Sequence, residues 1–224
     1  MTPAPVPDFT ERQNEVLASA LRLVVEGGEK ALTTAALARA ANCSKESLYK
    51  WFGDRDGLLA AIVAHQAAKV RVPHEARGAL DRDAFRDRLV TFAEDLLTVL
   101  AGDTSLALNR LAIAHASREG APLGRLLQER GRERIAERAR ALLEAGAAQG
   151  HIALNDATDA YRTLYGLIVR DAHGRWLLGE VPAGAEADFA ARARRAVDQF
   201  LTLFPAEFPP EFPPETKAQD RPPG

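Results

Sequence analysis

Apolar residues recur at spacings of one, three and four along most of the chain, which is the pattern of helices that bury one face. The first such segment runs from about 10 to 27. Thr10 and Gln13 have the spacing of a capping box at its start, and Gly27-Gly28 offers a stop at its end. Its apolar positions are Val16, Leu17, Ala20, Leu21 and Val24.

Three further helices are predicted before residue 70, because each is preceded by a polar residue able to cap it. Thr33 or Thr34 begins a short helix that ends at Asn42, Ser44 begins the next, and Asp54 begins a longer one. These closely spaced caps indicate a compact helical domain.

Longer helices are predicted beyond the break VPHEARG at 72–78, which we interpret as a domain junction. They are expected around 85–100, at 106–117, from Pro122 to Gly150, at 156–178 and at 185–204. No segment shows sustained alternation of apolar and polar residues, so strands are not expected. The predicted fold is all-α with about nine helices.

The predicted organisation has four parts: a disordered N-terminus (1–9), a first domain (10–70), a larger domain (79–204) and a Pro-rich disordered tail (205–224). Seven of the 13 prolines fall in this tail, where EFPP occurs twice. Such a composition favours polyproline-like disorder. The alternative is a recruitment peptide that anchors through Phe208 and Phe212.

Composition adds limits on partners and location. The net charge of −2 gives no global attraction to nucleic acid or membrane, so any polyanion site must be a local patch. The single cysteine suits a reducing compartment, and neither a signal peptide nor an 18-residue apolar run is present. We therefore expect a cytoplasmic protein without membrane contact.

The break at Asn42-Cys43-Ser44 matches a helix-turn-helix. Two short helices joined by three or four residues cross steeply, so the second can enter a DNA major groove while the first braces it. Asn42 tolerates the positive φ that a tight corner needs. Cys43 is interpreted as a core residue of the corner, with a redox switch as the alternative.

The second helix of this motif has a polar outer face. If Leu48 and Phe52 point inward, a rotation of 100° per residue turns the polar side chains outward. Lysine can donate to guanine, and glutamate can accept from the cytosine amino group. The candidates for base contact are Lys45, Glu46, Ser47 and Lys50.

The segment TTAALARAANCSKESLYKWFGDRDGLLAAIV, residues 33 to 63, resembles the DNA-binding segment of the TetR (tetracycline repressor) family. Asn42 and Cys43 depart from the family's usual Gly-Val. The resemblance implies an N-terminal three-helix helix-turn-helix DNA-binding domain and a larger C-terminal helical bundle for ligand binding and dimerisation. The matching positions are Thr33-Thr34, Leu37-Ala38, Ala41, Ser44, Leu48-Tyr49, Phe52 and Leu58.

The resemblance also implies roles for individual residues. Thr34 and Tyr49 would contact phosphates from two sides of the groove, with Arg55 as a third contact; for Tyr49, packing is the alternative. Trp51 would contact a phosphate or sugar, and Ser44 completes the DNA-contacting set.

Pairing and effector binding are expected in the larger domain. The family pairs through its last two long helices, and here both have apolar faces. The expected dimer interface comprises Leu167, Gly174, Leu178, Phe189, Ala193, Val197, Phe200 and Phe204. The expected pocket comprises Phe92, Asn109, His115, Arg118, Tyr165, Val169, His173 and Trp176, with hydrogen bonds at the surface or between helices as the alternative for the polar ones.

No catalytic motif or metal-ligand cluster occurs in the sequence, so we expect neither enzyme activity nor a cofactor or metal. The hypothesis is a ligand-responsive transcriptional regulator, a repressor that binds a palindromic DNA operator as a homodimer and is released by a small molecule. The alternative is a helical protein-interaction module that uses the Pro-rich tail and binds no specific DNA.

Overall fold

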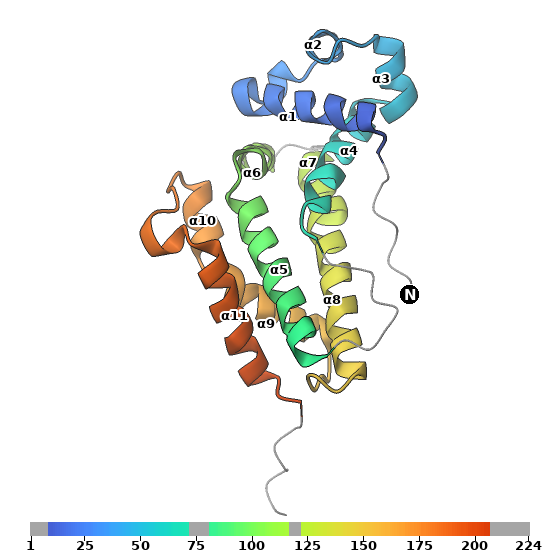
Figure 1. The fold of residues 1–224 in the computed structure, drawn as a ribbon. Coiled ribbons are helices and arrows are strands. Elements are labelled where there is room, and N and C mark those ends of the chain that lie inside the picture. Colours follow the sequence, from blue (N-terminus) through green and yellow to red (C-terminus); the bar gives the residue numbers. More distant parts are fainter. Residues whose placement is uncertain (1–8, 72–80, 117–121, 207–224) are drawn as a thin grey trace, which may run out of the picture.

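Helices make up nearly all of the computed structural model, which describes residues 9–71, 81–116 and 122–206 (Figure 1). No strand occurs within these ranges, and the all-α prediction is confirmed. The expected junction at 72–78, most of the expected N-terminal segment and nearly all of the tail lie outside the described residues.

The N-terminal helices begin and end close to where the sequence pattern places them. The capping box is confirmed, since the Thr10 N–H donates to Gln13 Oε1 at 2.9 Å and the Gln13 N–H donates to Thr10 Oγ1 at 3.3 Å. Gly28, with φ of 65°, interrupts the helical geometry of the first helix near its end. The helices are α1 (Glu11–Ala31), α2 (Thr34–Ala40), α3 (Lys45–Phe52) and α4 (Arg55–Ala68).

Two of the expected C-terminal helices are divided. The expected 122–150 helix contains a π-helical stretch, and the expected 156–178 helix breaks at Arg170, whose φ is 50°. The elements are α5 (Arg82–Ala101), α6 (Asp103–His115), α7 (Pro122–Leu126), the π-helix η1 (Leu127–Arg132), α8 (Glu133–Ala148), α9 (Ala157–Val169), α10 (Ala172–Leu177), the 3-10 helix η2 (Gly184–Glu186) and α11 (Phe189–Leu203).

Figure 1 shows α2 and α3 above α1, while α5, α8 and α11 extend below α1. In the described ranges no single helix is long and apolar enough to cross a membrane; α5 and α6 reach that length and composition only jointly, across a bend of 61°.

The helices enclose two hydrophobic cores. The boundary between the two cores does not coincide with the domain junction expected from the sequence. The first core lies under α1 to α4, but Leu108 of α6 and Leu123 and Leu126 of α7 complete it. The second lies among α5, α8, α9 and α11, and it takes in Ala67 in the last turn of α4 and Val70 just beyond that helix. Each core therefore contains side chains from the other side of the expected junction.

A buried arginine fixes the end of α4 to α8. Arg138 is 8% exposed and donates to the carbonyl of Ala67 at 2.7 Å and to that of Arg134 at 3.1 Å. Burial lowers the pKa of Arg138 from its usual value. Carbonyls in the last turn of a helix lack helical partners and carry partial negative charge, so the Ala67 carbonyl is a favourable acceptor for this cation.

Candidate nucleic-acid interface

The corner between α2 and α3 has the conformation that the sequence predicts. Asn42 adopts φ of 48°, in the left-handed region that asparagine tolerates better than most residues. The Cys43 N–H donates to the Ala38 carbonyl at 2.9 Å, which closes the end of α2. Ser44 Oγ then accepts from the Ser47 N–H at 3.1 Å and starts α3. Cys43 itself is half-buried against the first core.

Arg12 of α1 holds this corner from behind, a contact that the sequence pattern did not indicate. Its guanidinium donates to the carbonyls of Ala41 at 2.6 Å and Asn42 at 2.9 Å. Both carbonyls lie at the end of α2, where they have no helical partner. The partners are 29 and 30 residues away in the chain, so no local motif reveals the contact.

We expect Arg12→Met, which keeps the apolar stem, to loosen this corner. The variant loses the two hydrogen bonds to the carbonyls and also the exposed ion pair of Arg12 with Glu15. At this partly exposed site the loss should cost about 1 kcal/mol in the free energy of urea unfolding. It should also accelerate hydrogen exchange at the Cys43 amide. The matched control is Arg22→Met, because Arg22 lies on the same helix and its side chain donates to Ser19 Oγ. Equal effects of the two variants would contradict the assigned role of Arg12.

The outer face of α3 is polar, as expected. Leu48 and Phe52 are buried and point toward the first core, whereas Tyr49 is 57% exposed. Lys45, Glu46 and Lys50 are exposed and Ser47 is half-buried.

Glu46 stands at the start of α3 as a carboxylate. Its own backbone N–H and then the Ser44 hydroxyl donate to it, and both lower its pKa. It can therefore accept hydrogen bonds but would repel a nearby phosphate. Trp51 lies half-buried on the first core, edge-on to Phe52 with 6.3 Å between ring centroids, so only part of its side chain is open to a partner.

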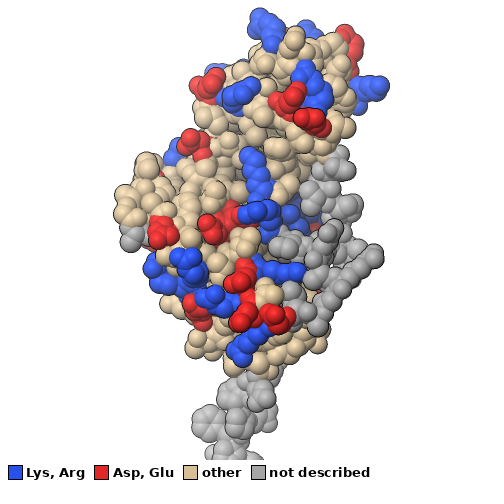
Figure 2. All heavy atoms as spheres, viewed as in Figure 1, with Lys and Arg blue, Asp and Glu red and all other residues tan. Residues whose placement is uncertain are grey.

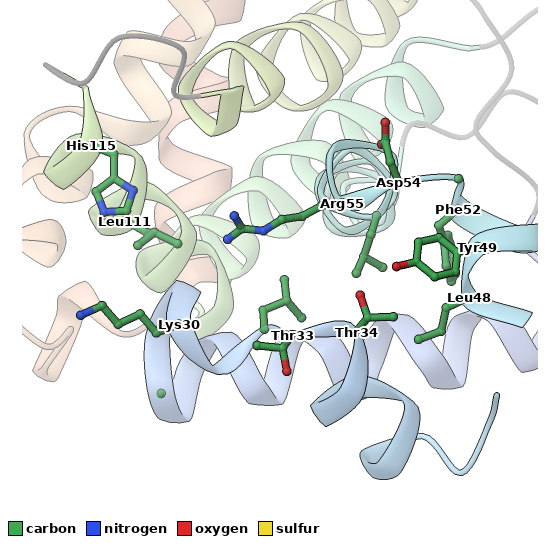
Figure 3. A pocket seen from close by; sticks show the side chains of 15 residues that line it. Lys30, Thr33, Thr34, Leu48, Tyr49, Phe52, Asp54, Arg55, Leu111 and His115 are labelled. Carbon is green, nitrogen blue, oxygen red and sulfur yellow. The ribbon is translucent and has the colours of Figure 1, made fainter. Parts of the chain in front are cut away.

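Thr34, Tyr49 and Arg55 surround one hollow beside α3, which has a volume of about 980 Å³. In Figure 3 the hydroxyls of Tyr49 and Thr34 face the same space, and Arg55 extends into it from the first turn of α4. Lys30, which the sequence pattern did not single out, stands at the edge of the hollow. The hollow thus joins hydroxyl donors and cations, the groups that bind phosphate oxygens.

The charges that line this hollow are mixed, because Asp54 lines it together with Lys30 and Arg55. Figure 2 shows basic and acidic side chains interspersed over the visible face of α1 to α4, without a large patch of one sign. Attraction of a polyanion therefore depends on the placement of a few donors rather than on bulk charge.

A second candidate site is an inner cavity of about 70 Å³ in the larger domain. Three of the expected pocket residues line it, namely Asn109, Tyr165 and His173. His115 lines the hollow beside α3 instead, and Arg118 lies outside the described residues. The remaining three are packed in the second core and do not line the cavity: Phe92, Val169 and Trp176.

Three of the eight residues expected at the dimer interface lie inside their own chain instead. Ala193, Val197 and Phe200 are buried in the second core, because the apolar face of α11 packs on α5 and α9 of the same chain. Phe189 and Phe204 are half-buried against Trp176 and Phe200. Of the other expected residues Leu167 is half-buried, and two are exposed: Gly174 and Leu178.

Comparison with known proteins agrees with this geometry. A sequence profile described as "Bacterial regulatory proteins, tetR family" matches residues 16–62, and one described as "AefR-like transcriptional repressor, C-terminal domain" matches residues 87–206. No match was found among proteins of curated function.

Three solved structures resemble this chain at different levels of sequence identity. A TetR transcriptional regulator from Agrobacterium tumefaciens is 61% identical, with a TM-score of 0.76 over 88% of this chain and 95% of that one. The flavonoid-responsive regulator FrrA is 25% identical, with a TM-score of 0.60 over 86% and 96%. A putative TetR-family regulator from Mesorhizobium loti, 23% identical with a TM-score of 0.66 over 88% and 99%, shares the fold.

The helix-turn-helix corner, the helical second domain and these matches over most of the chain lead to one assignment. The protein belongs to the TetR family of DNA-binding transcriptional regulators.

Proposed function

We propose that this protein is a repressor that binds a palindromic operator as a homodimer, with α3 in the major groove, and that a small organic effector in the inner cavity releases it. The observation that carries the proposal is the shared hollow of Thr34, Tyr49 and Arg55 beside the exposed face of α3. Phosphate contacts of this kind set the register of a protein on DNA, and the α3 side chains can then reach the base edges.

The combined variant Tyr49→Ala and Lys50→Ala tests this proposal. It removes one phosphate contact and one charged donor from an exposed face, so the fold should be kept while operator affinity falls at least about tenfold. Fluorescence anisotropy with the duplex upstream of the protein's own gene gives the affinity at several salt concentrations. Wild-type binding should weaken steeply with salt, and the variant should show a smaller salt slope.

Lys69→Ala is the charge-matched control, since Lys69 is exposed at the far end of α4 from α3. It should bind DNA almost as wild type does. Full affinity in the Tyr49 and Lys50 variant would show that α3 is not the reading helix. The tail-mediated interaction module would gain support if the wild-type protein bound no duplex at all.

The homodimer is proposed through the outward faces of α9 and α11. Gly166 of α9 is exposed, and a Cβ added there would have no described residue of its own chain within 4 Å. Leu167 lies beside it, and Arg170 donates to Gln199 of α11 at 3.4 Å across the same surface. A small residue at the centre of a helical face allows a second helix to approach closely, which supports pairing here.

Effector response is proposed to act through α4, because its last two turns contact both the cavity and the bundle. Val63, Gln66 and Ala67 line the cavity, and the Ala67 carbonyl is held by Arg138. Gly131 of η1 packs so closely on α4 that an added Cβ would lie 3.3 Å from Val63 Cγ1. A shift of η1 would therefore displace α4, and α4 connects directly to α3 through Gly53 and Asp54.

A cavity of about 70 Å³ is smaller than a typical ligand pocket of roughly 300 Å³ or more, so an effector would fit only if the cavity becomes larger. Effector binding would enlarge the cavity by moving the helices that line it. FrrA, as its name states, responds to flavonoids. This relationship favours an aromatic organic effector for the present protein as well.

A further inference from the structure

The inner cavity contains polar atoms that have no hydrogen-bond partner among the described residues. Gln66 is 9% exposed, and its Oε1 is fully buried without a hydrogen bond among the described residues. His173 Nε2, which belongs to another lining residue, is also buried and unpartnered there. A buried acceptor without a hydrogen bond destabilises the folded protein. A ligand that donates a hydrogen bond to Gln66 Oε1 would remove this cost.

One arginine supplies the positive charge of the cavity wall. Arg132 lines the cavity, and its guanidinium lies 5.7 Å from the centroid of the Tyr165 ring. Within the described part of the chain it forms no hydrogen bond or ion pair, and no Asp or Glu is among the described lining residues. Burial and then Arg132 lower the pKa of His173, which keeps that imidazole neutral.

Arg132 also stands where the cavity meets the surface. A side groove of about 750 Å³ between η1, α8 and α9 shares three lining residues with the cavity: Arg132, Tyr161 and Tyr165. The two tyrosine rings lie 6.1 Å apart at an interplanar angle of 54°. Burial first, and then the neighbouring Tyr165, raise the pKa of Tyr161 to about 12, so its hydroxyl stays protonated and can donate. The walls of the groove carry mixed charge, with three glutamates and three other arginines: Glu129, Glu133, Glu137, Arg134, Arg140 and Arg162. Where the groove meets the cavity, the shared lining residues are Arg132 and the two tyrosines, so an entry path along it ends at a cation and aromatic rings.

We infer that the effector is a small ring-bearing carboxylic acid with a hydroxyl group, which enters by the side groove, places its carboxylate on Arg132 and donates its hydroxyl to Gln66 Oε1. An arginine pairs well with a carboxylate, and the neighbouring tyrosine rings suit a flat apolar body. This inference rests on the proposed effector response of the same cavity.

Calorimetry with three related probes tests both contacts. 4-Hydroxybenzoate carries both groups, methyl 4-hydroxybenzoate lacks the charge, and benzoate lacks the hydroxyl. We expect the acid to bind the wild-type protein at least about tenfold more tightly than its ester and several-fold more tightly than benzoate. Arg132→Gln should abolish the preference for acid over ester, and Gln66→Leu should abolish the preference for 4-hydroxybenzoate over benzoate.

Arg130→Gln is the matched control, because Arg130 lies in the same π-helix and does not line the cavity. It should keep both preferences. Equal binding of acid and ester, or a Kd weaker than ~1 mM for 4-hydroxybenzoate, would overturn the inference.

DNA release, measured separately by anisotropy, distinguishes this inference from the proposed function. If the probes bind with the expected preferences but the protein is not released from the operator, the inferred ligand class is supported and the proposed effector response is contradicted. Release by an uncharged compound alone, with no binding of the acid, would contradict the ligand class while supporting the response.

Discussion

Phe200→Glu is expected to unfold the protein rather than to separate a dimer. The side chain is 0% exposed and stacks on Phe204 with 4.6 Å between ring centroids. Loss of a buried phenylalanine costs about 3–5 kcal/mol, and a carboxylate without a partner in an apolar core adds several more. Because the total stability of a domain is about 5–15 kcal/mol, the thermal midpoint should fall by more than ~10 °C, or no cooperative transition should remain. Circular dichroism during heating measures this.

Gly166→Glu separates folding from pairing. It adds the same charge on the outward face of α9, where a Cβ has no neighbour within 4 Å. Its thermal midpoint should stay close to that of the wild type, while sedimentation should show monomers if α9 contributes to the dimer. If the Phe200→Glu protein were folded and monomeric, this result would instead support the dimer interface first expected from the sequence.

Gly57→Ala should disturb the DNA-reading end of the molecule more than any other replacement of a glycine by alanine in α1 to α4. A Cβ at this position would lie 2.0 Å from the carbonyl oxygen of Phe52, the last residue of α3. That oxygen belongs to the backbone, so the clash can be relieved only if α3 moves relative to α4. Such overpacking costs about 1–3 kcal/mol, and sometimes more. Urea unfolding should reveal the loss of stability, and operator affinity should fall as α3 is displaced.

Gly124→Ala is the control for this variant. Gly124 lies in α7, and an added Cβ would have no neighbour within 4 Å among the described residues. Because alanine favours helix over glycine by about 0.5–1 kcal/mol, this change should be neutral or slightly stabilising. Similar losses in both variants would mean that the close approach of Gly57 to Phe52 does not determine the position of α3.

Local sequence signals predicted the DNA-reading end of the molecule well. The capping box at Thr10, the corner at Asn42 and the cap at Ser44 all depend on contacts within a few residues, so the sequence contains their determinants. The helix break at Arg170 was not predicted, because arginine gives no signal for φ of 50°. The corner contact of Arg12 depends on the folded arrangement and was missed for that reason.

The faces of α11 illustrate a further limit of the sequence. An apolar stripe shows that one side of a helix is covered, but it does not identify what covers it. Ala193, Val197 and Phe200 were assigned to a second subunit, whereas α5 and α9 of the same chain cover them. The inner cavity was similarly hard to predict, since Gln66 and Arg132 reach it from segments that are distant in sequence.

The sharing of core residues across the expected junction limits how such regulators can be recombined. In a chimaera, residues 1–70 of this protein would be replaced by those of another regulator. The foreign helices would then pack against Leu108, Leu123 and Leu126, which are fitted to the original helices. The replacement would also remove Ala67 and Val70 from the other core. The unit that keeps the first core intact is therefore discontinuous in sequence: α1 to α4 must be transferred together with α6 and α7. A graft of new operator specificity must in addition match Ala67, Val70 and Leu106 to the second core of the recipient.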